Sequence, residues 1–561
     1  MKKQRYIEAM ADALSAYTDE HIKSYFERVK KEGITEHGFP RLTANIGILL
    51  CRGHRENLLP LFVEMMDLCI ADMANPRNDI SKGNGNDFSV KELIFCLLEV
   101  EKRALVPKEK TEGWRKTLAT IEPEKTYTQF ARKSTDIVNN WAVFTAVSEW
   151  MRRAIGLADT TDFVDLQLSS QTRYIDYNGM YRDPHEPMVY DLVTRGLFCV
   201  LLHFGYEGVY KDLIDAAQKK AGLLTLKMQS VTGELPYGGR SAQFMHNEAQ
   251  LALNMEFEAN RYKREGNMEL ASLFKARAER ALENIEYWFK KNPIHHVKNR
   301  YPLESGFGCE GYAYFDKYMI TAASFLYVAY LFADDEIEAK ESRREPSVSF
   351  TSEHFHKCFM EAGEYFLEFD LNADLHYDED GLGRVHKKGA PSPLCLSTSM
   401  TATPTYTLSA PRAASMAPGY KESGEMHLAL SHAATYRPIG TQTTADTAAV
   451  QMLSEFENGT VLLHDYKVSE GGVDITVREA KGEKAPCFSF LAFDFDGETK
   501  TEIITSETGV SVTYEGWRCT YETNGRIFTK DEYAENRNGR YRVFYAEAKD
   551  TLSLHIAIEK V

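Results

Sequence analysis

The spacing of apolar residues changes once along this chain, and that change constrains its fold more than any other feature. From the N-terminus to about Phe366, apolar residues recur at intervals of three and four, the period of helices that bury one face. From about Leu371, apolar and polar residues alternate as they do in strands. The sequence therefore predicts a mostly α then β chain, with a helical domain at 1–368 and a β domain at 369–561.

The helical part consists of segments that are each apolar on one face only. The clearest are 58–70, 90–100, 137–155, 188–204, 242–262, 268–289 and 314–332, most of them bounded by Gly, Pro, Asn or Asp. Such helices need a closed ring or a stacked solenoid to bury all their apolar faces. Because no motif repeats at the fixed period of a solenoid, we expect an α/α toroid of the six-hairpin type, complete or lacking some hairpins.

A charged connector at 334–352 and one further helix at 354–366 are expected before the strands begin. The clearest strand patterns lie at 461–466, 473–477, 488–495, 510–514, 540–546 and 552–558. The turn Glu457-Asn458-Gly459 is a strong hairpin signal. These patterns predict a C-terminal antiparallel β-sandwich.

Net charge and hydropathy exclude several kinds of partner. The 561 residues carry 66 Lys and Arg against 82 Asp and Glu, a net charge of −16. No basic run is long enough to follow a phosphate backbone, so we expect neither nucleic acid nor an anionic membrane surface as a partner. No apolar stretch reaches the ~18–20 residues that span a bilayer. The sequence leaves open whether the protein forms a homo-oligomer.

Cysteine usage and the first residues indicate a cytoplasmic protein. The nine cysteines are odd in number, scattered and without a CxxC pair, which is typical of reduced thiols. Polar and charged residues follow Met1 at once and interrupt any signal-peptide core. We also expect the chemical step to need no metal and no organic cofactor, because neither metal-ligand spacing nor a nucleotide-binding motif is present; a calcium ion with a purely structural role stays open. The pair His295-His296 is expected at the surface.

Four stretches are too dense in polar and aromatic residues for an ordinary helix surface. The first is Asn139-Asn140-Trp141 at the start of an apolar helix. Asn caps helices well, and Trp141 could simply be a core residue. The same three side chains could bind a sugar through amide hydrogen bonds and ring stacking. Both interpretations stay open.

The second stretch runs from Tyr174 to Pro187 and continues into a helix. Its prolines indicate a loop, and loops held by rigid helices often carry sites. Tyrosines suit sugar stacking, whereas acids and histidine suit proton transfer. The candidate catalytic residues here are Tyr181, Asp183 and Asp191, and the candidate binding residues are Tyr177, His185, Tyr190 and Arg195. A polar connector with aromatic packing is the alternative.

The third stretch runs from Gly233 to Glu248 and contains the pair Gly238-Gly239 before Arg240. Arginine can hold a carboxylate with two hydrogen bonds, and His246 or Glu248 could move a proton. The spacing of Gln243, His246 and Asn247 predicts that they share one helix face. With Tyr237, these residues complete the candidates of this stretch. A buried polar cluster that fixes hairpin packing is the competing interpretation.

The fourth stretch, 304–314, is a glycine-rich aromatic loop before an apolar helix. Glu304 and Glu310 could be catalytic carboxylates, or they could cap the helix that follows. Tyr312 is a candidate for sugar stacking.

With these residues in view, the sequence resembles heparinase II/III-type and alginate-lyase-type polysaccharide lyases and related uronate-acting glycoside hydrolases. The Gly-Gly-Arg-Ser segment and the His-Asn-Glu-Ala segment that follows it (238–249) are most similar to glycoside hydrolase family 154, which implies an exo-β-glucuronidase. The lyases pair an Asn with a His, and here Trp141 follows Asn140, so that histidine would be His246 or His185.

The first functional hypothesis is therefore an exo-β-glucuronidase that releases a terminal glucuronate from an oligosaccharide. Two carboxyl groups would act as acid and as base or nucleophile, and Arg240 would hold the uronate carboxylate. The alternative is a lyase, in which Tyr181 or a histidine removes a proton while Asn140 and Arg240 neutralise the carboxylate. A noncatalytic carbohydrate-binding protein is a third, less favoured hypothesis.

Overall fold

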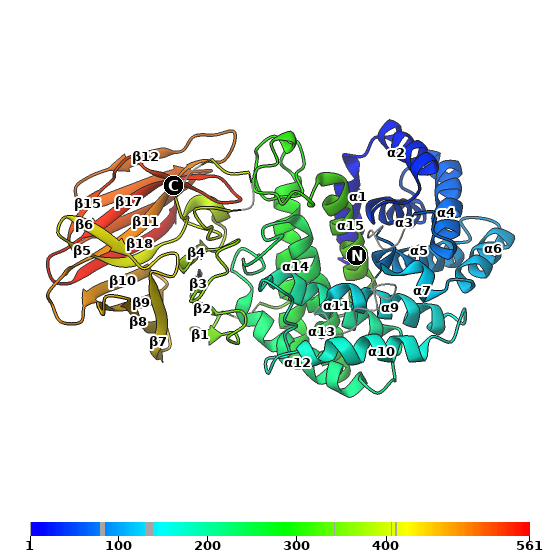
Figure 1. Ribbon diagram of the computed structural model, residues 1–561, viewed down its shortest axis with the longest axis horizontal. Coiled ribbons are helices and arrows are strands. Elements are labelled where there is room, and N and C mark those ends of the chain that lie inside the picture. The colour runs from blue at the N-terminus through cyan, green and yellow to red at the C-terminus, as the bar shows by residue number, and fades with distance from the viewer. Residues whose placement is uncertain (1, 79–84, 129–138, 342, 405–406, 410–411) are drawn as a thin grey trace.

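The computed structural model of the protein describes residues 2–78, 85–128, 139–341, 343–404, 407–409 and 412–561. Helices form the first part of the chain and antiparallel sheets the second (Figure 1). The predicted order of a helical toroid followed by antiparallel sheets is thus confirmed. None of the helices in these ranges combines the length and apolar composition that crossing a bilayer requires. All nine cysteines, each within the described ranges, are free thiols.

The predicted helical segments correspond closely to observed helices. The helices are α1 (Gln4–Ser15), α2 (Asp19–Glu32), α3 (Gly38–Leu50), α4 (Leu59–Ala74), α5 (Val90–Arg103), α6 (Lys108–Ala119), α7 (Pro123–Thr126), α9 (Asn140–Ala154), α10 (Thr161–Gln171), α11 (Met188–His203), α12 (Lys211–Met228), α13 (Met245–Arg264), α14 (Met268–Phe289) and α15 (Phe315–Phe332). Residues 137 and 138, expected in the helix that starts at Asn140, lie outside the described residues. Helix α13 begins at Met245 rather than at Ala242.

Six helices form a closed inner ring. In the described residues, α3, α5, α9, α11, α13 and α15 pack against one another in that order, and α15 packs back onto α3. Asn45 Nδ2 fastens this closure by donating to Ile320 O at 3.2 Å and to Ser324 Oγ at 3.3 Å. A closed ring covers both faces of its helices, and every residue of α3 is buried. The toroid is therefore closed by α15 and α3.

The outer helices keep the one-sided pattern that the sequence shows. In α14, Ala271, Phe274, Ala278 and Ile285 are buried at helical spacing and face the ring. Burial of a large apolar side chain such as Phe274 contributes about 1.5–3 kcal/mol. Amphipathic outer helices thus hold the inner ring in place.

The strands of the described residues form three sheets. They are β1 (Ser347–Phe350), β2 (Lys357–Ala362), β3 (Tyr365–Asp370), β4 (Gly381–Lys387), β5 (Ala417–Glu422), β6 (Glu425–Leu428), β7 (Ala434–Thr443), β8 (Ala448–Phe456), β9 (Val461–Ser469), β10 (Gly472–Glu479), β11 (Ala485–Phe495), β12 (Glu502–Thr505), β13 (Gly509–Tyr514), β14 (Trp517–Thr523), β15 (Arg526–Phe528), β16 (Tyr533–Glu535), β17 (Arg540–Glu547) and β18 (Leu552–Lys560). The sheet orders are β1-β2-β3-β4, β12-β13-β14-β18-β10-β9-β8-β7 and β15-β17-β11-β5-β6, with β16 paired to β17. The predicted strands are present as β9, β10, β11, β13, β17 and β18.

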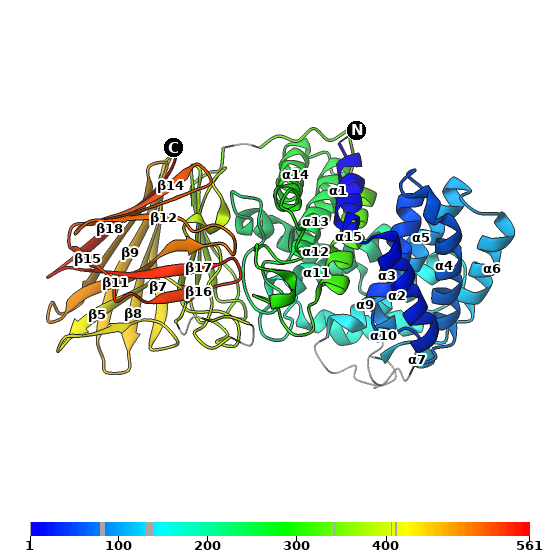
Figure 2. The same ribbon diagram turned by 90° about the horizontal axis from the view of Figure 1, so that it is seen from above.

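The first sheet lies between the toroid and the two large sheets, which occupy the other end of the molecule (Figure 2). The predicted helix at 354–366 is wrong, because β2 and β3 run through it. Both strands are buried on both faces: Met360 packs into the core of the β region, whereas Phe359 and Phe366 pack with Met188 and Met228 of the toroid. A strand that is buried on both sides shows no visible alternation.

The expected division at 368/369 falls inside β3, which spans Tyr365–Asp370. The last helix of the ring ends at Phe332 and the first strand begins at Ser347. We propose that the division lies in the segment between them.

Candidate active site

A cavity of ≈ 570 Å³ opens at one end of the toroid, within the size range of small-ligand sites. Its described lining residues are Glu36, His37, Arg41, Gly85, Phe88, Asn139, Asn140, Trp141, Phe144, Asp183, Pro184, His185, Tyr190, Val193, Arg240, His246, Tyr312, Lys317, Tyr318, Thr321 and Phe325.

The cavity lies at the N-terminal ends of the inner helices. Each helix contributes a residue from its first turns or from just before them: Arg41 of α3, Phe88 before α5, Asn140 of α9, Tyr190 of α11, His246 of α13 and Lys317 of α15. The N-terminus of a helix carries roughly half a positive charge. Six such ends directed at one cavity favour an anionic ligand.

Asn140, Asp183 and Arg240 form one hydrogen-bonded unit in the cavity wall. Asn140 Nδ2 donates to Asp183 Oδ2 at 3.0 Å, and the Arg240 guanidinium forms an ion pair with Asp183 Oδ1. Asp183 is 1% exposed. Burial raises the pKa of its carboxyl group, and the Arg240 charge opposes that rise. Both oxygens of Asp183 are therefore already used by the protein. Locally, Asn139 caps α9 by accepting from Trp141 N at 2.9 Å.

Four hydroxyl groups form a chain beside this unit. Tyr190 OH lies 3.2 Å from both Ser241 Oγ and Tyr318 OH, and Ser241 Oγ lies 3.1 Å from Tyr312 OH. The Arg240 guanidinium lies 4.6 Å from the centre of the Tyr190 ring, so positive charge stands against its face. Burial raises the pKa of Tyr312 and Tyr318, which keeps both hydroxyls protonated. The chain can therefore donate and relay protons.

His246 is a neutral imidazole enclosed by aromatic rings. Its ring centre lies 5.2 Å from that of Tyr318 and 5.9 Å from that of Phe244. Burial, and then the charge of Arg41, lower the pKa of His246 to about 3. In the described part of the chain its Nδ1 has no hydrogen-bond partner. A neutral histidine in this position can accept a proton.

Arg41 lies deeper in the ring and orients a second histidine. Its guanidinium donates to Thr321 Oγ1 at 2.6 Å and to His37 Nδ1 at 2.8 Å. Because arginine has no acceptor, His37 must present a lone pair at Nδ1 and is neutral. Burial likewise lowers the pKa of His37.

Lys317 and Glu36 complete the charged lining. Burial lowers the pKa of the Lys317 ammonium group. Within the described ranges, no carboxylate lies within the 4.0 Å ion-pair distance of its Nζ. Glu36, in contrast, accepts from Tyr25 OH and from Gly38 N, the latter at 3.0 Å. Lys317 is therefore a cation that a ligand can use.

The lining is richer in cations than the rest of the chain. Among its described residues, Arg41, Arg240 and Lys317 are cationic, whereas Glu36 and Asp183 are the carboxylates. The whole chain, in contrast, carries a net charge of −16. The local excess of positive charge, together with the helix ends, favours a negatively charged ligand.

Nine of the residues expected from the sequence line the cavity. They are Asn139, Asn140, Trp141, Asp183, His185, Tyr190, Arg240, His246 and Tyr312. They come from all four stretches, which the closed ring brings to one place.

Other expected residues are bound to partners away from the cavity lining. Tyr181 OH donates to Gln171 Oε1 at 2.6 Å, and Asp191 pairs with Arg195 at 2.7 Å. The same Asp191 accepts from Tyr181 N at 2.7 Å. These contacts fix the loop before α11.

The remaining expected residues lie in several environments. Glu248 accepts from Lys298 Nζ at 2.8 Å, and Glu310 accepts from Ser241 N behind the cavity wall. Tyr237 is buried with Lys357 Nζ 3.6 Å from its ring centre. Tyr177 and Glu304 are exposed, whereas Asn247 is buried in α13.

Two local expectations are wrong. Gln243 does not share a helix face with His246, because it precedes α13 and has φ 63°. His295 and His296 are buried rather than at the surface, and His296 Nε2 donates to Ala313 O at 2.7 Å. The positions of glycine and proline in the sequence indicate neither the start of α13 after Gln243 nor the burial of His295 and His296.

Several lining residues are missing from the sequence-based candidates. The polar ones are Glu36, His37, Arg41, Lys317, Tyr318 and Thr321. The sequence signal that could have identified them is a charged residue close to the first turn of an otherwise apolar helix. In α3, for example, Arg41 stands among Phe39, Leu42 and Ile46.

Comparisons with known proteins show the fold. No protein-family model matches the sequence, and no curated protein matches it. The structure is similar to that of heparinase III, at 8% identity and a TM-score of 0.51, covering 93% of this chain and 77% of that one. It is also similar to the heparinase III that is the BT4657 gene product, at 9% identity and a TM-score of 0.50, covering 100% and 84%. The chain thus has the helical-toroid and β-sheet fold of these heparinases.

Proposed function

We propose that the protein is a lyase that cleaves oligosaccharides by β-elimination at a uronate whose O4 carries the leaving sugar. In this reaction the C5–H bond and the C4–O4 bond break, a C4–C5 double bond forms, and no water is consumed. The reaction needs neutralisation of the carboxylate, a base for the C5 proton and a proton for the leaving oxygen. The cavity contains a group for each need.

We assign the binding of the substrate's uronate carboxylate to the cationic side chains of the cavity. Within the described ranges Lys317 forms no ion pair with a carboxylate, whereas Arg41 contacts Thr321 and His37 and also lies 3.5 Å from Glu92 Oε1. Lys317 can therefore attract a uronate without first giving up an ion pair, and Arg41 adds a second positive charge that Glu92 partly balances. Asn140 and Arg240, joined through Asp183, can donate to the same carboxylate from the other wall. Such donors stabilise the negative charge that develops when the C5 proton leaves.

The proton transfers are assigned to His246 and Tyr190. The neutral His246 imidazole can accept the C5 proton. A uronate bound beside Arg41 would offset the charge that lowers the His246 pKa, so its basicity would rise when substrate binds. Tyr190 OH can protonate the leaving oxygen and recover a proton through Ser241 and Tyr318.

The observation that carries this proposal is the distribution of partners around the cavity. The neutral imidazole and the hydroxyl chain are available, whereas both described carboxylates of the lining already accept hydrogen bonds from the protein. The similarity to heparinase III structures supports the same reading, although at 8–9% identity it concerns the fold.

One observation favours an exo-β-glucuronidase as a second candidate. Burial raises the pKa of Asp183, as a general acid requires, and Glu36 lines the same cavity. A hydrolase would use these two as its carboxyl pair. Asp183 would first have to release Arg240 and Asn140.

The test is incubation with uronate-containing oligosaccharides, including heparan and chondroitin fragments, and separately with an aryl glucuronide. A lyase gives a product whose C4–C5 double bond, conjugated with the carboxylate, absorbs in the ultraviolet. Release of free glucuronate without that absorbance would favour the hydrolase instead. Inactivity on every uronate, with activity on a neutral glycan, would reject both.

A further inference from the structure

A turn of the β region is buried against the loops behind the cavity wall. It comprises residues 536–539 and connects β16 to β17. Asn536, Arg537 and Asn538 are each at most 1% exposed, although turns usually lie on the surface. Asn538 Nδ2 fastens the turn to the toroid by donating to Lys298 O at 2.8 Å. Since buried polar side chains need partners, this turn is an interface element rather than a surface connection.

The Arg537 guanidinium lies at the centre of this interface. Its Nη1 donates to Gly308 O at 2.8 Å and lies 3.3 Å from Glu310 Oε2. Its Nη2 lies 3.4 Å from both Glu310 Oε1 and Gly239 O. The guanidinium carbon is also 5.8 Å from the centre of the Phe244 ring. The planar fork of donors allows one arginine to reach a carboxylate and two carbonyls together. Arg537 thus connects loops of the toroid that lie far from it in the sequence.

Glu310 transmits the contact with Arg537 to Ser241. The Ser241 N–H donates to Glu310 Oε1, the same oxygen that faces Arg537 Nη2. Ser241 has φ 60°, a left-handed conformation that a residue with a side chain keeps only where its surroundings hold it. Its Oγ lies 3.2 Å from Tyr190 OH and 3.1 Å from Tyr312 OH. The backbone of Ser241 therefore decides whether its hydroxyl joins the chain that serves Tyr190.

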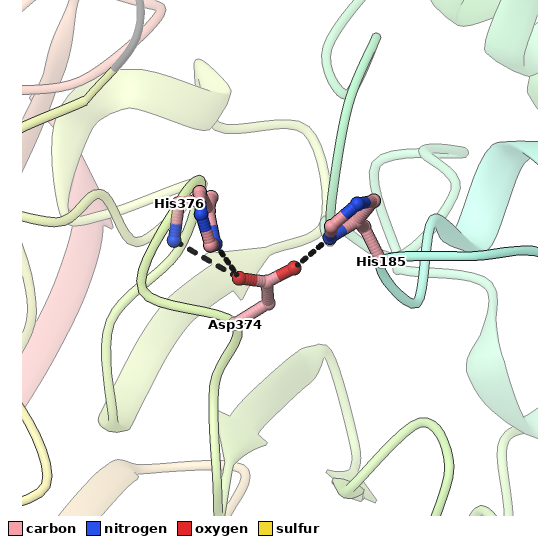
Figure 3. Close-up of side chains that lie close together, drawn as sticks. All are labelled: His185, Asp374 and His376. Carbon is pink, nitrogen blue, oxygen red and sulfur yellow. Dashed lines mark hydrogen bonds and ion pairs between the residues drawn. The ribbon is translucent and has the colours of Figure 1, made fainter.

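Other contacts from the β region hold the same wall independently of Arg537. Asp378 Oδ2 accepts from Gly239 N at 2.6 Å, and Asp374 Oδ2 lies 2.9 Å from His185 Nδ1 (Figure 3). Both contacts act on segments that precede Arg240 in the sequence. Loss of the Arg537 contacts should therefore displace Ser241 more than Arg240.

We propose that Arg537 is a positioning residue for the elimination and acts through Glu310 on Ser241. The inference rests on the proposed function, because in that mechanism Ser241 helps to return a proton to Tyr190. Arg537 is absent from the described residues that line the cavity, so it acts on the reaction only through other groups. Displacement of a catalytic group by about 1 Å can lower a rate roughly 10²-fold. A side chain behind the wall can thus control turnover.

The first test is Arg537→Lys in the full-length chain. Lysine keeps the positive charge but lacks the planar fork, so it cannot hold Glu310 and both carbonyls. We expect kcat to fall roughly 10²-fold with little change in KM, because Asp378 still holds the loop before Arg240. In a Ser241→Ala background the same substitution should lower kcat hardly any further, since two changes that act through one group are not additive.

Arg344→Lys is the matched control. Arg344 is 7% exposed and donates to Gln229 O at 2.8 Å and to Ser230 O at 3.1 Å. It also donates to Glu361 Oε2 at 2.9 Å. It therefore joins the toroid to β2 through the same kinds of partner, two carbonyls and a carboxylate, but away from the cavity lining. Its variant should keep the kcat and KM of the wild type.

Amide hydrogen exchange gives a second readout that needs no reaction. Because Glu310 holds the Ser241 N–H, exchange in the segment 239–244 should be faster in Arg537→Lys and unchanged in Arg344→Lys. If the wild type forms no unsaturated product, the proposed function is wrong, and exchange in this segment still tests whether Arg537 holds Ser241. Unchanged exchange in folded Arg537→Lys would overturn the proposal. So would an equal loss of kcat with and without Ser241→Ala, or an equal loss in the control.

Discussion

Asp183 joins Arg240 to Asn140: one carboxylate oxygen pairs with the Arg240 guanidinium, and the other accepts from Asn140 Nδ2 at 3.0 Å. Both side chains that the sequence suggests for holding a uronate are thus oriented by one buried acid. Asp183 is therefore a positioning residue in the lyase account. Its substitution should disturb two substrate contacts together.

Asp183→Asn should lower kcat/KM roughly 10²–10⁴-fold, because two charge-assisted hydrogen bonds are misplaced and each costs about 1.5–3 kcal/mol. The shape of the pH–rate profile should stay the same, since Asp183 transfers no proton. Steady-state kinetics across pH check this. Loss of an entire limb of the profile would instead identify Asp183 as the general acid of a hydrolase.

Tyr190→Phe should reduce turnover by roughly 10²–10⁴-fold, the usual contribution of a positioned proton donor, with little change in KM. The ring and its contact with Arg240 remain, so binding is preserved. Tyr177→Phe, at an exposed tyrosine outside the lining, is the control and should keep full activity. Equal rates for both variants would remove Tyr190 from the mechanism.

Lys317→Met should raise KM for a uronate substrate by roughly 10- to 100-fold, because a charge-assisted contact worth about 1.5–3 kcal/mol is lost. A substrate whose carboxylate has been reduced to an alcohol separates this contact from general packing. The wild type should bind it weakly, and the variant should bind it no worse. If the variant binds the reduced substrate more weakly than the wild type does, Lys317 contacts a part of the substrate other than the carboxylate.

The acid side of the pH–rate profile tests His246. Its pKa of about 3 keeps the imidazole neutral in the free enzyme throughout the range above pH 5. We therefore expect no fall in kcat/KM near pH 6.5 that depends on this residue, and His246→Gln should lower the rate equally at all these pH values. A limb near pH 6.5 that disappears in the variant contradicts this expectation.

Buried histidines should make the fold sensitive to acid. Burial lowers the pKa of His464 to about 3, and Ser454 Oγ lies 2.9 Å from its Nε2. The unfolded chain binds a proton below about pH 6.5, whereas the folded chain does not. The contribution of neutral His464 to the free energy of unfolding is thus fully present above pH 6.5, and it is lost as the pH falls toward 3. Between pH 6.5 and 4.5 the loss should be about 2–3 kcal/mol.

Denaturant unfolding of wild type and His464→Gln checks this dependence. Between pH 6.5 and 4.5 the free energy of unfolding of the variant should change less steeply with pH than that of the wild type, by the slope that one bound proton gives. If the free energy of unfolding changes equally with pH in both proteins, His464 binds a proton as readily in the folded chain as in the unfolded chain.

The periodicity of apolar residues is local, so it predicts elements whose burial is one-sided, such as α14 and β9. It fails in β2, where burial is two-sided. In β2, alternate residues such as Phe359 and Met360 meet different cores, and the sequence shows a continuous apolar run. That run has the same appearance as a short helix.

The candidate site is predictable where polar residues gather before an inner helix, as at Asn140, Tyr190 and Arg240. Lys317 and Arg41 lie inside apolar helices, and only closure of the ring brings α3 beside α15. His185 of the cavity lining pairs with Asp374 across 189 positions, a separation at which spacing in the sequence carries no signal.

The central claim is elimination rather than hydrolysis, and the fate of water tests it most directly. The reaction should be run in ¹⁸O-labelled water and its products weighed by mass spectrometry. Elimination predicts products whose masses sum to that of the substrate, with no label in either fragment at early times. Products that together weigh one water more than the substrate, with the label at the new reducing end, would contradict the account.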